Sequence, residues 1–569
     1  MKIKGTELFI KALREENVDT LFAYPGAAVI TLFDELYKQK DIRVILPRHE
    51  QALVHEADGF ARSTGKVGVC LVTSGPGATN IVTGIATANY DSVPIVCFCG
   101  QVRRDLIGND AFQEVDIVGI TRGITKHSMM VTDRNQLGRA IKEAFYIAST
   151  GKPGPVVVDL PVDMINEMGD GQYPKDVQIR SYRPNKAAHI GQIKRAAALL
   201  REAEKPLLLA GGGIHVSGSE AEFTQLAEQT RIPVISTVMG KGSIPTSHPL
   251  YIGNLGMHGC FAANRAVMEC DALCSIGSRF NDRITGRVDQ FAPKAKIIHI
   301  DIDTASISRN VKVDIPIVAD ALHAIIELIN YTGEHNTADW RKEIEAWQRE
   351  YPLKAAKSKG FSSARIIELM NRTFTECIVV TDVGQHQMWT AQYLELNEKK
   401  KLLTSGGLGT MGYGFPAAIG AKLGNPMKRV ICIAGDGGIQ MNIQELATAV
   451  LEEIPIIILI FNNCYLGMVR QWQQLMYDRR YAGTNLRSGN YGRNKPEQYI
   501  PDFVKLAESY NAVGLRVFNE NELITAFEAA QKEEKRPVVI ECVIDSEEIV
   551  LPMVKAGCSL NEMILGDEL

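Results

Sequence analysis

The sequence predicts an α/β protein of three doubly wound domains, each built around a parallel sheet. Short apolar runs typical of strands alternate with amphipathic helical patterns along the 569-residue chain, as expected where helices connect parallel strands. The runs fall into three blocks of similar rhythm, and at roughly 150 residues per domain the length suggests three or four domains. Most runs end in glycine or small polar residues, the kind of loop that binds ligands beyond the carboxyl ends of parallel strands.

The first block is predicted to span residues 1–165 and opens with an amphipathic helical segment, MKIKGTELFIKALREE. Its strand-like runs are VDTLFAYPG, IRVILP, VGVCLVTSGPG, PIVCFCG and GPVVVDLP. A polar stretch at 167–186, EMGDGQYPKDVQIRSYRPNK, is predicted to be a linker.

The second block is predicted to span residues 187–335, with the runs KPLLLAGGG, PVISTV, ALCSIGSR, AKIIHIDID and PIVAD. A charged helical stretch, TADWRKEIEAWQREYPLKAAKSKG, leads to the third block, predicted at 361–546. That block holds CIVVTDVG, RVICIAGDGG, PIIILIFNN and RPVVIECVID, and residues 547–569 form a C-terminal tail.

Composition argues against several classes of protein. The net charge of −4 is spread along the chain, so nothing indicates binding to nucleic acid or to an anionic membrane. No apolar run reaches about 18 residues, and the N-terminus lacks the apolar core of a signal peptide. The eleven cysteines have no metal-ligand spacing, which indicates reduced thiols. We therefore expect a cytoplasmic protein.

One glycine pattern, Gly407-Leu408-Gly409-Thr410-Met411-Gly412, fits the G-x-G-x-x-G fingerprint of dinucleotide-binding domains. That fingerprint requires a preceding strand and an acidic residue about 20 positions later. The preceding stretch is NEKKKLLTSG, in which no strand is predicted, and position 429 is arginine. A nicotinamide site is therefore not expected here.

A stronger motif follows in the third block. One predicted strand ends in Gly435-Asp436-Gly437-Gly438 and the next ends in Asn462-Asn463, so Asp436 and Asn463 are 27 positions apart, one strand–helix–strand unit. Such a unit brings both side chains to the same sheet edge. A carboxylate and an amide oxygen are hard ligands suited to Mg²⁺, and the two glycines let backbone N–H groups approach a diphosphate.

This pattern resembles that of the thiamine-diphosphate (ThDP) enzymes. The resemblance implies that Glu50, in IRVILPRHEQA, hydrogen-bonds the cofactor's aminopyrimidine ring, and that Met411 supports the bent cofactor from beneath. It places Gln385 and His386 beside the diphosphate. It also implies that Tyr465 joins Asp436 and Asn463 at the metal. Further ThDP contacts are implied for Tyr24, Pro25, Thr73, Asn80, Gly409, Gly437, Gly438, Met441, Gly467 and Met468.

The resemblance narrows to the catalytic subunits of acetohydroxyacid synthases and covers nearly the whole chain. The strings that carry it include FAYPGAAV, RHEQALVHEADGFAR, TSGPGATN, DAFQE, SRFNDRITG, GTMGYGFPAAIGA, GDGGIQMNIQELATA and LGMVRQWQ. It implies that the chain decarboxylates pyruvate and transfers the two-carbon unit to pyruvate or 2-ketobutyrate. The products are 2-acetolactate and 2-aceto-2-hydroxybutyrate, early intermediates of branched-chain amino-acid synthesis.

Five positions are implied to act on the substrates. Arg283 aligns with the arginine that binds the acceptor's carboxylate, for which a guanidinium fork is suited. An ordinary ion pair between Arg283 and Asp282 is the alternative. Trp472 aligns with the tryptophan that favours 2-ketobutyrate as acceptor. Phe112, Gln113 and Lys126 align with other catalytic positions.

The middle block resembles the family's FAD domain, in which FAD is held without net redox. The FAD contacts implied by the resemblance are Lys152, Gly211, Gly212, Gly213, Thr237, His258, Gly277, Arg279, Asn281, Asp301 and Asp320.

The sequence departs from the family pattern in four places. Ala27 replaces a glycine near the reacting carbon, Lys152 replaces an arginine, and Asn281 replaces an aspartate beside the flavin. The loop Lys555-Ala556-Gly557 is less proline-rich than usual. These changes bear on FAD affinity and loop closure rather than on the chemistry.

Three alternatives remain open: a flavin-dependent pyruvate oxidase, a carboligase acting on glyoxylate or a sulfonated aldehyde, and a catalytically silent paralogue. The retained Glu50, Asp436 and Asn463 argue against the last. The resemblance also implies a homodimer or homotetramer with active sites between subunits, and a separate small regulatory subunit.

Overall fold

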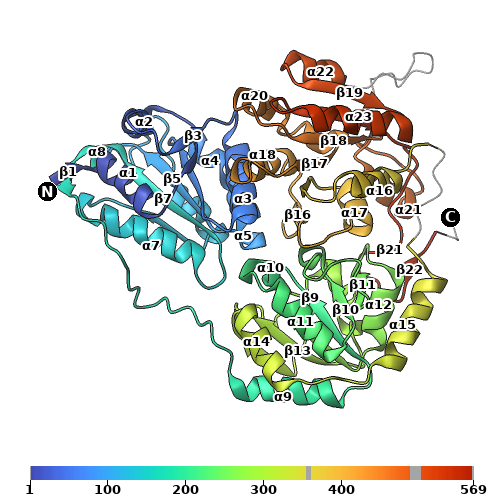
Figure 1. The fold of residues 1–569 in the computed structure, drawn as a ribbon. Helices are drawn as coiled ribbons and strands as arrows, with labels where there is room; N and C mark the ends of the chain where they lie inside the picture. Colours follow the sequence, from blue (N-terminus) through green and yellow to red (C-terminus); the bar gives the residue numbers. More distant parts are fainter. Residues whose placement is uncertain (1, 354–359, 487–500, 567–569) are drawn as a thin grey trace.

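The computed structural model describes residues 2–353, 360–486 and 501–566, and these residues form three six-stranded sheets in which all neighbouring strands are parallel (Figure 1). Each sheet belongs to one of the three sequence blocks. The α/β class with three doubly wound domains is therefore confirmed. Two small antiparallel pairs, β1 with β8 and β21 with β22, complete the strands of the described residues.

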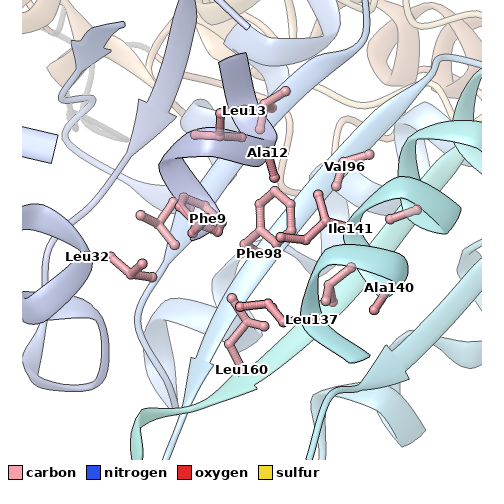
Figure 2. Packing of buried hydrophobic residues seen from close by; sticks show 14 of the residues in the cluster. Phe9, Ala12, Leu13, Leu32, Val96, Phe98, Leu137, Ala140, Ile141 and Leu160 are labelled. Carbon is pink, nitrogen blue, oxygen red and sulfur yellow. The ribbon is translucent and has the colours of Figure 1, made fainter. Parts of the chain in front are cut away.

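The first sheet has the strand order β3-β2-β4-β5-β7-β6. Successive residues of β5 (Ile95–Gln101) alternate between two buried clusters, with Val96 and Phe98 on one face and Ile95, Cys97 and Cys99 on the other. Figure 2 shows the first cluster, where Phe9 of helix α1 meets Phe98 edge-on with ring centroids 4.8 Å apart. The other strands are β1 (Lys2–Lys4), β2 (Thr20–Ala23), β3 (Arg43–Ile45), β4 (Gly68–Val72), β6 (His127–Met130) and β7 (Pro155–Pro161), and the helices are α1 (Gly5–Glu15), α2 (Ile30–Tyr37), α3 (Glu50–Thr64), α4 (Pro76–Asn80), α5 (Val82–Asp91), α6 (Ile117–Thr121), α7 (Leu137–Ser149) and α8 (Val162–Asn166).

The stretch predicted to be a linker begins inside the first domain. Strand β8 (Met168–Asp170) pairs with β1, and the chain then runs without regular structure to helix α9, crossing between two domains in Figure 1.

The middle sheet has the order β11-β10-β9-β12-β13-β14. Its elements are α9 (Ile190–Glu202), β9 (Pro206–Ala210), α10 (Gly213–Ser217), α11 (Glu220–Thr230), β10 (Val234–Ser236), β11 (Tyr251–Asn254), α12 (Phe261–Glu269), β12 (Ala272–Ile276), α13 (Asp282–Thr285), β13 (Lys296–Asp301), β14 (Ile315–Val318), α14 (Ala321–Tyr331) and α15 (Ala338–Glu350).

The third sheet has the order β16-β15-β17-β18-β20-β19, and a short C-terminal tail returns to the boundary with the middle domain (Figure 1). Its elements are α16 (Ser363–Thr373), β15 (Ile378–Thr381), α17 (Gln385–Tyr393), β16 (Lys401–Thr404), α18 (Gly414–Gly424), β17 (Val430–Gly435), α19 (Asp436–Ile439), α20 (Leu446–Leu451), β18 (Ile457–Asn462), α21 (Gly467–Met476), α22 (Phe503–Ser509), β19 (Val513–Val517), α23 (Glu520–Lys532), β20 (Val538–Val543), β21 (Met553–Val554) and β22 (Met563–Ile564).

Helices α3 and α18 join the first and third domains and lie side by side in Figure 1. Their backbones approach so closely that a Cβ on Gly59 would overlap the carbonyl of Ala417, and a Cβ on Gly420 would overlap the carbonyl of Glu56. Glycine is required at such a crossing because any side chain would separate the helices. The crossing fixes the start of α3, and hence Glu50, relative to the third domain.

Four strands of the three large sheets were not predicted: β6, β11, β16 and β19. Each of them is an edge strand. An edge strand has one neighbour, so its side chains need not form a fully buried run, and the partly buried residues of β19 show this. Strand β16 ends just before the Gly407–Gly412 pattern, so the argument that no strand precedes it is wrong. The missing acidic residue still separates the pattern from a dinucleotide site.

None of the described helices is long and apolar enough to cross a membrane. All eleven cysteines are free thiols, and eight of them are buried.

Candidate active site

Asp436 and Asn463 lie at the same edge of the third sheet. Asp436 directly follows β17 and Asn463 directly follows β18, and these two strands are parallel neighbours. The Asp436 side chain is buried, which raises its pKa to about 7, and its Oδ2 has no hydrogen-bond partner. The Asn463 Oδ1 accepts a hydrogen bond from the Tyr465 N–H at 3.0 Å. A buried carboxylate oxygen without a partner is costly unless a cation or donor offsets it.

This oxygen set fits Mg²⁺. Among the described residues no group of three or more His, Cys, Asp or Glu side chains could hold a metal ion. A single carboxylate beside an amide oxygen matches the way Mg²⁺ binds, since that ion takes most of its remaining ligands from water and substrate phosphates.

Space beside Asp436 is left by glycines. A Cβ on Gly438 would lie 2.6 Å from Asp382 Oδ1, and a Cβ on Gly437 would lie 2.6 Å from Leu466 and 3.8 Å from the Met411 methyl. The backbone at the start of α19 is therefore packed tightly, and the absence of side chains at these two glycines lets a diphosphate approach the turn. Met411 lies next to this turn.

Gln385 and His386 begin helix α17 at the same edge. Gln385 Oε1 accepts a hydrogen bond from Asn463 Nδ2 at 3.1 Å, and a Cβ on Gly467 would overlap both side chains. Burial lowers the pKa of His386 to about 3, so the ring is neutral, and its Nε2 has no partner. Met441 packs beside Gly412 on the neighbouring loop. The structure thus brings together the residues predicted to surround the metal and the diphosphate.

Glu50 lies in a second group, at the carboxyl edge of the first sheet. It is the first residue of α3, is 9% exposed, and accepts a hydrogen bond from Asn80 Nδ2 at 2.9 Å. Gly77 lies beside it, and Gly26 packs against Thr73, whose hydroxyl is buried without a partner. Tyr24 and Pro25 lead into this loop, and the Tyr24 N–H donates to the Leu71 carbonyl at 2.9 Å.

Within the described part of the chain, no hydrogen bond or ion pair joins the Glu50 group to the Asp436 group. Besides the crossing of α3 with α18, Glu445 of the third domain holds the start of α3 by accepting hydrogen bonds from the Arg48 N–H at 3.0 Å. The chain therefore presents two halves of the predicted ThDP site as separate clusters.

Phe112 and Gln113 lie on the loop after β5. Phe112 is 87% exposed, and Gln113 has φ of 60°, a left-handed conformation that is strained for a residue with a side chain. Gln113 packs against Gly75, which brings it to the Glu50 group. Strain of this kind is common at functional sites.

Lys126 lies apart from both groups. Its Nζ donates to the carbonyls of Ile147 and Thr150, the latter at 2.7 Å, and to the Tyr182 hydroxyl at 3.0 Å. It therefore caps the C-terminal end of helix α7, and burial lowers its pKa to about 8. The contacts hold the Lys126 amine against its own domain, and its catalytic role stays a prediction.

A cavity of about 1320 Å³ lies between the three domains. Its volume fits a ligand as large as FAD. The buried His258 Nδ1 and Asn281 Oδ1 have no hydrogen-bond partner, as expected of groups that await one. Gly211 lies behind the wall, where a Cβ would overlap Gly277. The predicted FAD residues that line the cavity are Lys152, Gly212, Gly213, Thr237, His258, Gly277, Arg279, Asn281, Asp301 and Asp320.

Three of the departures from the family pattern can be located. Lys152 forms an ion pair with Asp303 at 3.1 Å at the cavity wall, and Asn281 lies just before helix α13 without a capping hydrogen bond from its side chain. Ala27 begins a short 3₁₀ turn after Gly26, and nothing in the structure explains its choice over glycine.

Arg283 and Trp472 meet in the lining of the same cavity, to which Met468 and Gly409 also contribute. The Arg283 side chain is half exposed and makes only loose contacts, with Asp282 at 3.8 Å and with the Met257 sulfur at 3.5 Å. The Asp282 ion pair that was the alternative for Arg283 is thus present but long. The guanidinium is left available to a ligand.

A buried polar network that was not predicted joins the first domain to the glycine loop of the third. Arg62 pairs with Asp58 at 2.7 Å and with Asp91 at 3.0 Å, and Tyr413 donates to Asp58 at 2.7 Å. Asp91 also accepts the Gly407 N–H at 2.7 Å. The amide that a dinucleotide fingerprint would offer to phosphate is therefore bound to a carboxylate. The sequence signal that could have indicated this network is the pair of opposite charges in DGFAR, Asp58 and Arg62.

Asp382 also makes buried contacts that were not predicted from the sequence. Its buried carboxylate accepts backbone N–H groups from Val383 at 2.7 Å and from Gly412 and Gly414 at 3.0 Å. It thereby fixes the loop that carries Met411.

The chain is similar to three family models that together span most of it. Residues 3–120 match the N-terminal TPP binding domain of thiamine pyrophosphate enzymes, residues 193–328 match the central domain, and residues 382–542 match the C-terminal TPP binding domain.

Full-length relatives are also similar. The acetolactate synthase large subunit of Haemophilus influenzae is 45% identical, with 99% of this chain and 98% of the relative covered. The probable acetolactate synthase large subunit of Methanocaldococcus jannaschii is 46% identical over 99% of this chain and 95% of the relative. The acetolactate synthase isozyme 3 large subunit of Escherichia coli K12 is 43% identical over 99% and 98%.

Proposed function

The chain belongs to the acetolactate synthase large-subunit family of thiamine pyrophosphate enzymes, and we propose that it decarboxylates pyruvate and transfers the two-carbon unit to a second 2-keto acid. The acceptors are pyruvate, giving 2-acetolactate, and 2-ketobutyrate, giving 2-aceto-2-hydroxybutyrate. This reaction places the chain in the synthesis of branched-chain amino acids.

The observation that carries the proposal is the meeting of Arg283 and Trp472 at one cavity wall, with the guanidinium carbon 5.6 Å from the indole centroid. A 2-keto acid has a carboxylate at one end and a short alkyl group at the other. The guanidinium is suited to the carboxylate and the indole face to the alkyl group. The pair thus supports an acceptor of this chemical class.

ThDP and Mg²⁺ are assigned to the two sheet edges. ThDP supplies the electron sink for decarboxylation when bound. Asp436, Asn463 and the Tyr465 backbone would hold Mg²⁺, and the turn at Gly437 and Gly438 would bind the diphosphate. The Glu50 carboxylate would hold a proton at the aminopyrimidine ring, while Met411 would support the cofactor from beneath.

FAD is assigned to the cavity between the domains. The residues that would hold it are the polar and glycine residues of the wall, Arg279 and Asp301 among them. We propose that FAD serves as a bound structural group, since the synthase reaction transfers no electrons overall.

We also propose an assembly of at least two copies. No hydrogen bond or ion pair of the described residues joins the Glu50 group to the Asp436 group, and we propose that a site using both takes one from each subunit. Mixing a Glu50→Gln variant with an Asp436→Ala variant tests this, because each mixed dimer then carries one intact site. Recovery of about a quarter of wild-type activity is expected, and no recovery would refute the shared site.

The relatives are named large subunits, and we propose a small regulatory subunit as partner.

The deciding experiment is incubation with pyruvate, ThDP, Mg²⁺ and FAD, followed by identification of the product and measurement of oxygen uptake. Acetolactate without oxygen uptake is expected. Stoichiometric oxygen uptake would identify a pyruvate oxidase instead. Activity with glyoxylate or a sulfonated aldehyde but not with pyruvate would identify another carboligase, and no turnover of any keto acid would identify a silent paralogue.

A further inference from the structure

Gln471 is fully buried on helix α21, and its amide group makes contacts in two directions. On one side its Oε1 accepts a hydrogen bond from Gln385 Nε2 at 2.9 Å, and Gln385 in turn accepts from Asn463 Nδ2 at 3.1 Å. The Gln385 contact holds Asn463 with its Oδ1 turned away from Gln385. One arm of Gln471 therefore reaches the metal end of the site through a single side chain.

The other arm of Gln471 holds the C-terminal segment. Its Oε1 accepts the Val550 N–H at 2.8 Å and its Nε2 donates to the Val550 carbonyl at 3.0 Å, so both backbone groups of Val550 depend on this one side chain. The Nε2 also approaches the Met553 sulfur at 3.3 Å. Because Val550 and Met553 are fully buried, water cannot replace these hydrogen bonds.

The segment held by Gln471 forms the floor beneath Trp472. Leu551 and Met553 pack with Met257 in a small buried cluster against which the Trp472 ring lies. Met257 also accepts the Val554 N–H at 2.8 Å and contacts the Arg283 guanidinium through its sulfur at 3.5 Å. The positions of Arg283 and Trp472 therefore both depend on the 548–554 segment.

We propose that Gln471 is a positioning residue that couples the Asn463 end of the site to the 548–554 segment, and through it to the Arg283 and Trp472 pair. The proposal rests on the function proposed above. In this arrangement, binding at the metal end fixes Gln385 and Gln471 more firmly, and this further stabilises the 548–554 segment beneath Arg283 and Trp472.

The test uses the full-length protein with two substitutions and a matched control. Gln471→Leu removes every contact in both directions. Gln471→Glu keeps the shape and the accepting oxygen but loses the donor to the Val550 carbonyl. Gln473→Leu is the control, because Gln473 is a glutamine on the same helix whose contacts, with the Ala482 carbonyl and the Thr484 hydroxyl, lead away from the tail.

The first readout is hydrogen exchange of residues 547–554, with and without ThDP and Mg²⁺. In the wild type and in Gln473→Leu the ligands should slow exchange. In Gln471→Leu exchange of the Val550 amide should be roughly tenfold faster, the effect of losing one buried hydrogen bond. Its response to the ligands should be smaller than in the wild type but not zero, because Gln385 still donates to the Glu548 carbonyl at 3.2 Å. Gln471→Glu keeps the Val550 N–H contact and should show a smaller change in the same direction.

The second readout is the division of product between acetolactate and acetaldehyde. A residue that merely stabilises the fold would lower total turnover without altering this ratio, whereas Gln471→Leu and Gln471→Glu should raise the acetaldehyde fraction several-fold over Gln473→Leu.

Ligand-responsive exchange in Gln471→Leu equal to that of the wild type would overturn the coupling, as would a product ratio equal to that of Gln473→Leu. If the wild type forms no acetohydroxy acid, the proposed function fails, and the exchange experiment still decides the coupling.

Discussion

The guanidinium carbon of Arg283 lies 5.6 Å from the centroid of the Trp472 ring, although the two residues belong to different domains. Arg283 comes from the short helix α13 of the middle domain, and Trp472 from helix α21 of the third. The contact is of cation–π type, and it sets a charged group beside an apolar face at one wall of the cavity. The predictions for these two residues differ because each would contact a different end of the acceptor.

Arg283→Ala should impair transfer to the acceptor more than decarboxylation. Removing a charge-assisted contact to the carboxylate should weaken acceptor binding by about 1.5–3 kcal/mol, roughly tenfold or more. The two-carbon unit should then be released in part as acetaldehyde. Product analysis measures this, with Arg287→Ala as control, since Arg287 pairs with Asp289 on the surface. An unchanged ratio of acetolactate to acetaldehyde would contradict the role.

Trp472→Leu should spare pyruvate as acceptor and reduce the preference for 2-ketobutyrate. The two acceptors differ by one methylene, which is worth about 1–3 kcal/mol in an apolar pocket, so the preference should fall roughly tenfold to a hundredfold. Competition between the two keto acids, with both acetohydroxy acids quantified, gives the ratio. Tyr477→Leu, at an exposed position just after the same helix, should leave the ratio as it is. A similar loss in that control would assign the effect to helix α21 as a whole.

Glu50→Gln should lower turnover by orders of magnitude while ThDP still binds. The amide keeps the size and the contact with Asn80 but lacks the charge that stabilises the required ring tautomer. Exchange of the cofactor's C2 proton, followed by NMR, measures this step directly. Glu15→Gln, at an exposed position of helix α1, is the matched control. Exchange at the wild-type rate in Glu50→Gln would rule out the role.

Asp436→Ala should weaken Mg²⁺ and ThDP together. The buried Asp436 carboxylate has one oxygen without a partner, and its removal takes away the acidic ligand proposed for the metal. Titration of each ligand in the presence of the other, by calorimetry, should show both affinities reduced. Asp478→Ala, on an exposed loop, should change neither. ThDP affinity that is indifferent to Asp436→Ala would refute the metal assignment.

Glu56→Met should stabilise the fold, and more so at higher pH. Glu56 is fully buried at the crossing of α3 and α18, and neither of its carboxyl oxygens has a hydrogen-bond partner. Burial raises the pKa of Glu56 well above its ordinary value, with a further rise from Glu445 and Glu452 and a smaller opposing effect of Arg48. Replacing an unpaired buried polar group by an apolar one should gain about 1–3 kcal/mol.

The sign of the pH dependence follows from proton uptake. Above the unfolded-state pKa of about 4.3 the unfolded chain has lost the Glu56 proton while the folded chain keeps it. Stability therefore falls as pH rises, by about 1.4 kcal/mol per pH unit from this group, up to the folded-state pKa. Thermal unfolding of wild type and Glu56→Met from about pH 5 to pH 8 should diverge, with Glu15→Met as surface control. Parallel curves would show that Glu56 has a partner in solution.

Several features of this protein were predictable because they are local. Strands such as β5 and β17 are buried on both faces, so they appear in the sequence as continuous apolar runs. The Asp436 and Asn463 pair was predictable for a related reason: parallel neighbours joined by one helix end at the same edge, so spacing along the chain determines proximity in space.

The edge strands and the buried polar contacts were not predictable in this way. Strand β19 pairs on one side only, and its residues carry no continuous apolar signal. Gly407 belongs to a sequence motif that resembles a phosphate-binding loop, yet its N–H donates a hydrogen bond to Asp91 of another domain. Neither outcome is encoded within a short window of residues.

The sequence by itself determined the α/β class, the three sheets and the chemistry available at each strand end, because periodicity and burial act over one strand–helix–strand unit. Only the tertiary structure decided that Arg283 meets Trp472, that Lys126 caps helix α7, and that Gln471 holds the C-terminal segment. Those contacts depend on how whole domains pack against one another. Domain packing results from many weak contacts between residues far apart in the sequence, so no local sequence pattern predicts it.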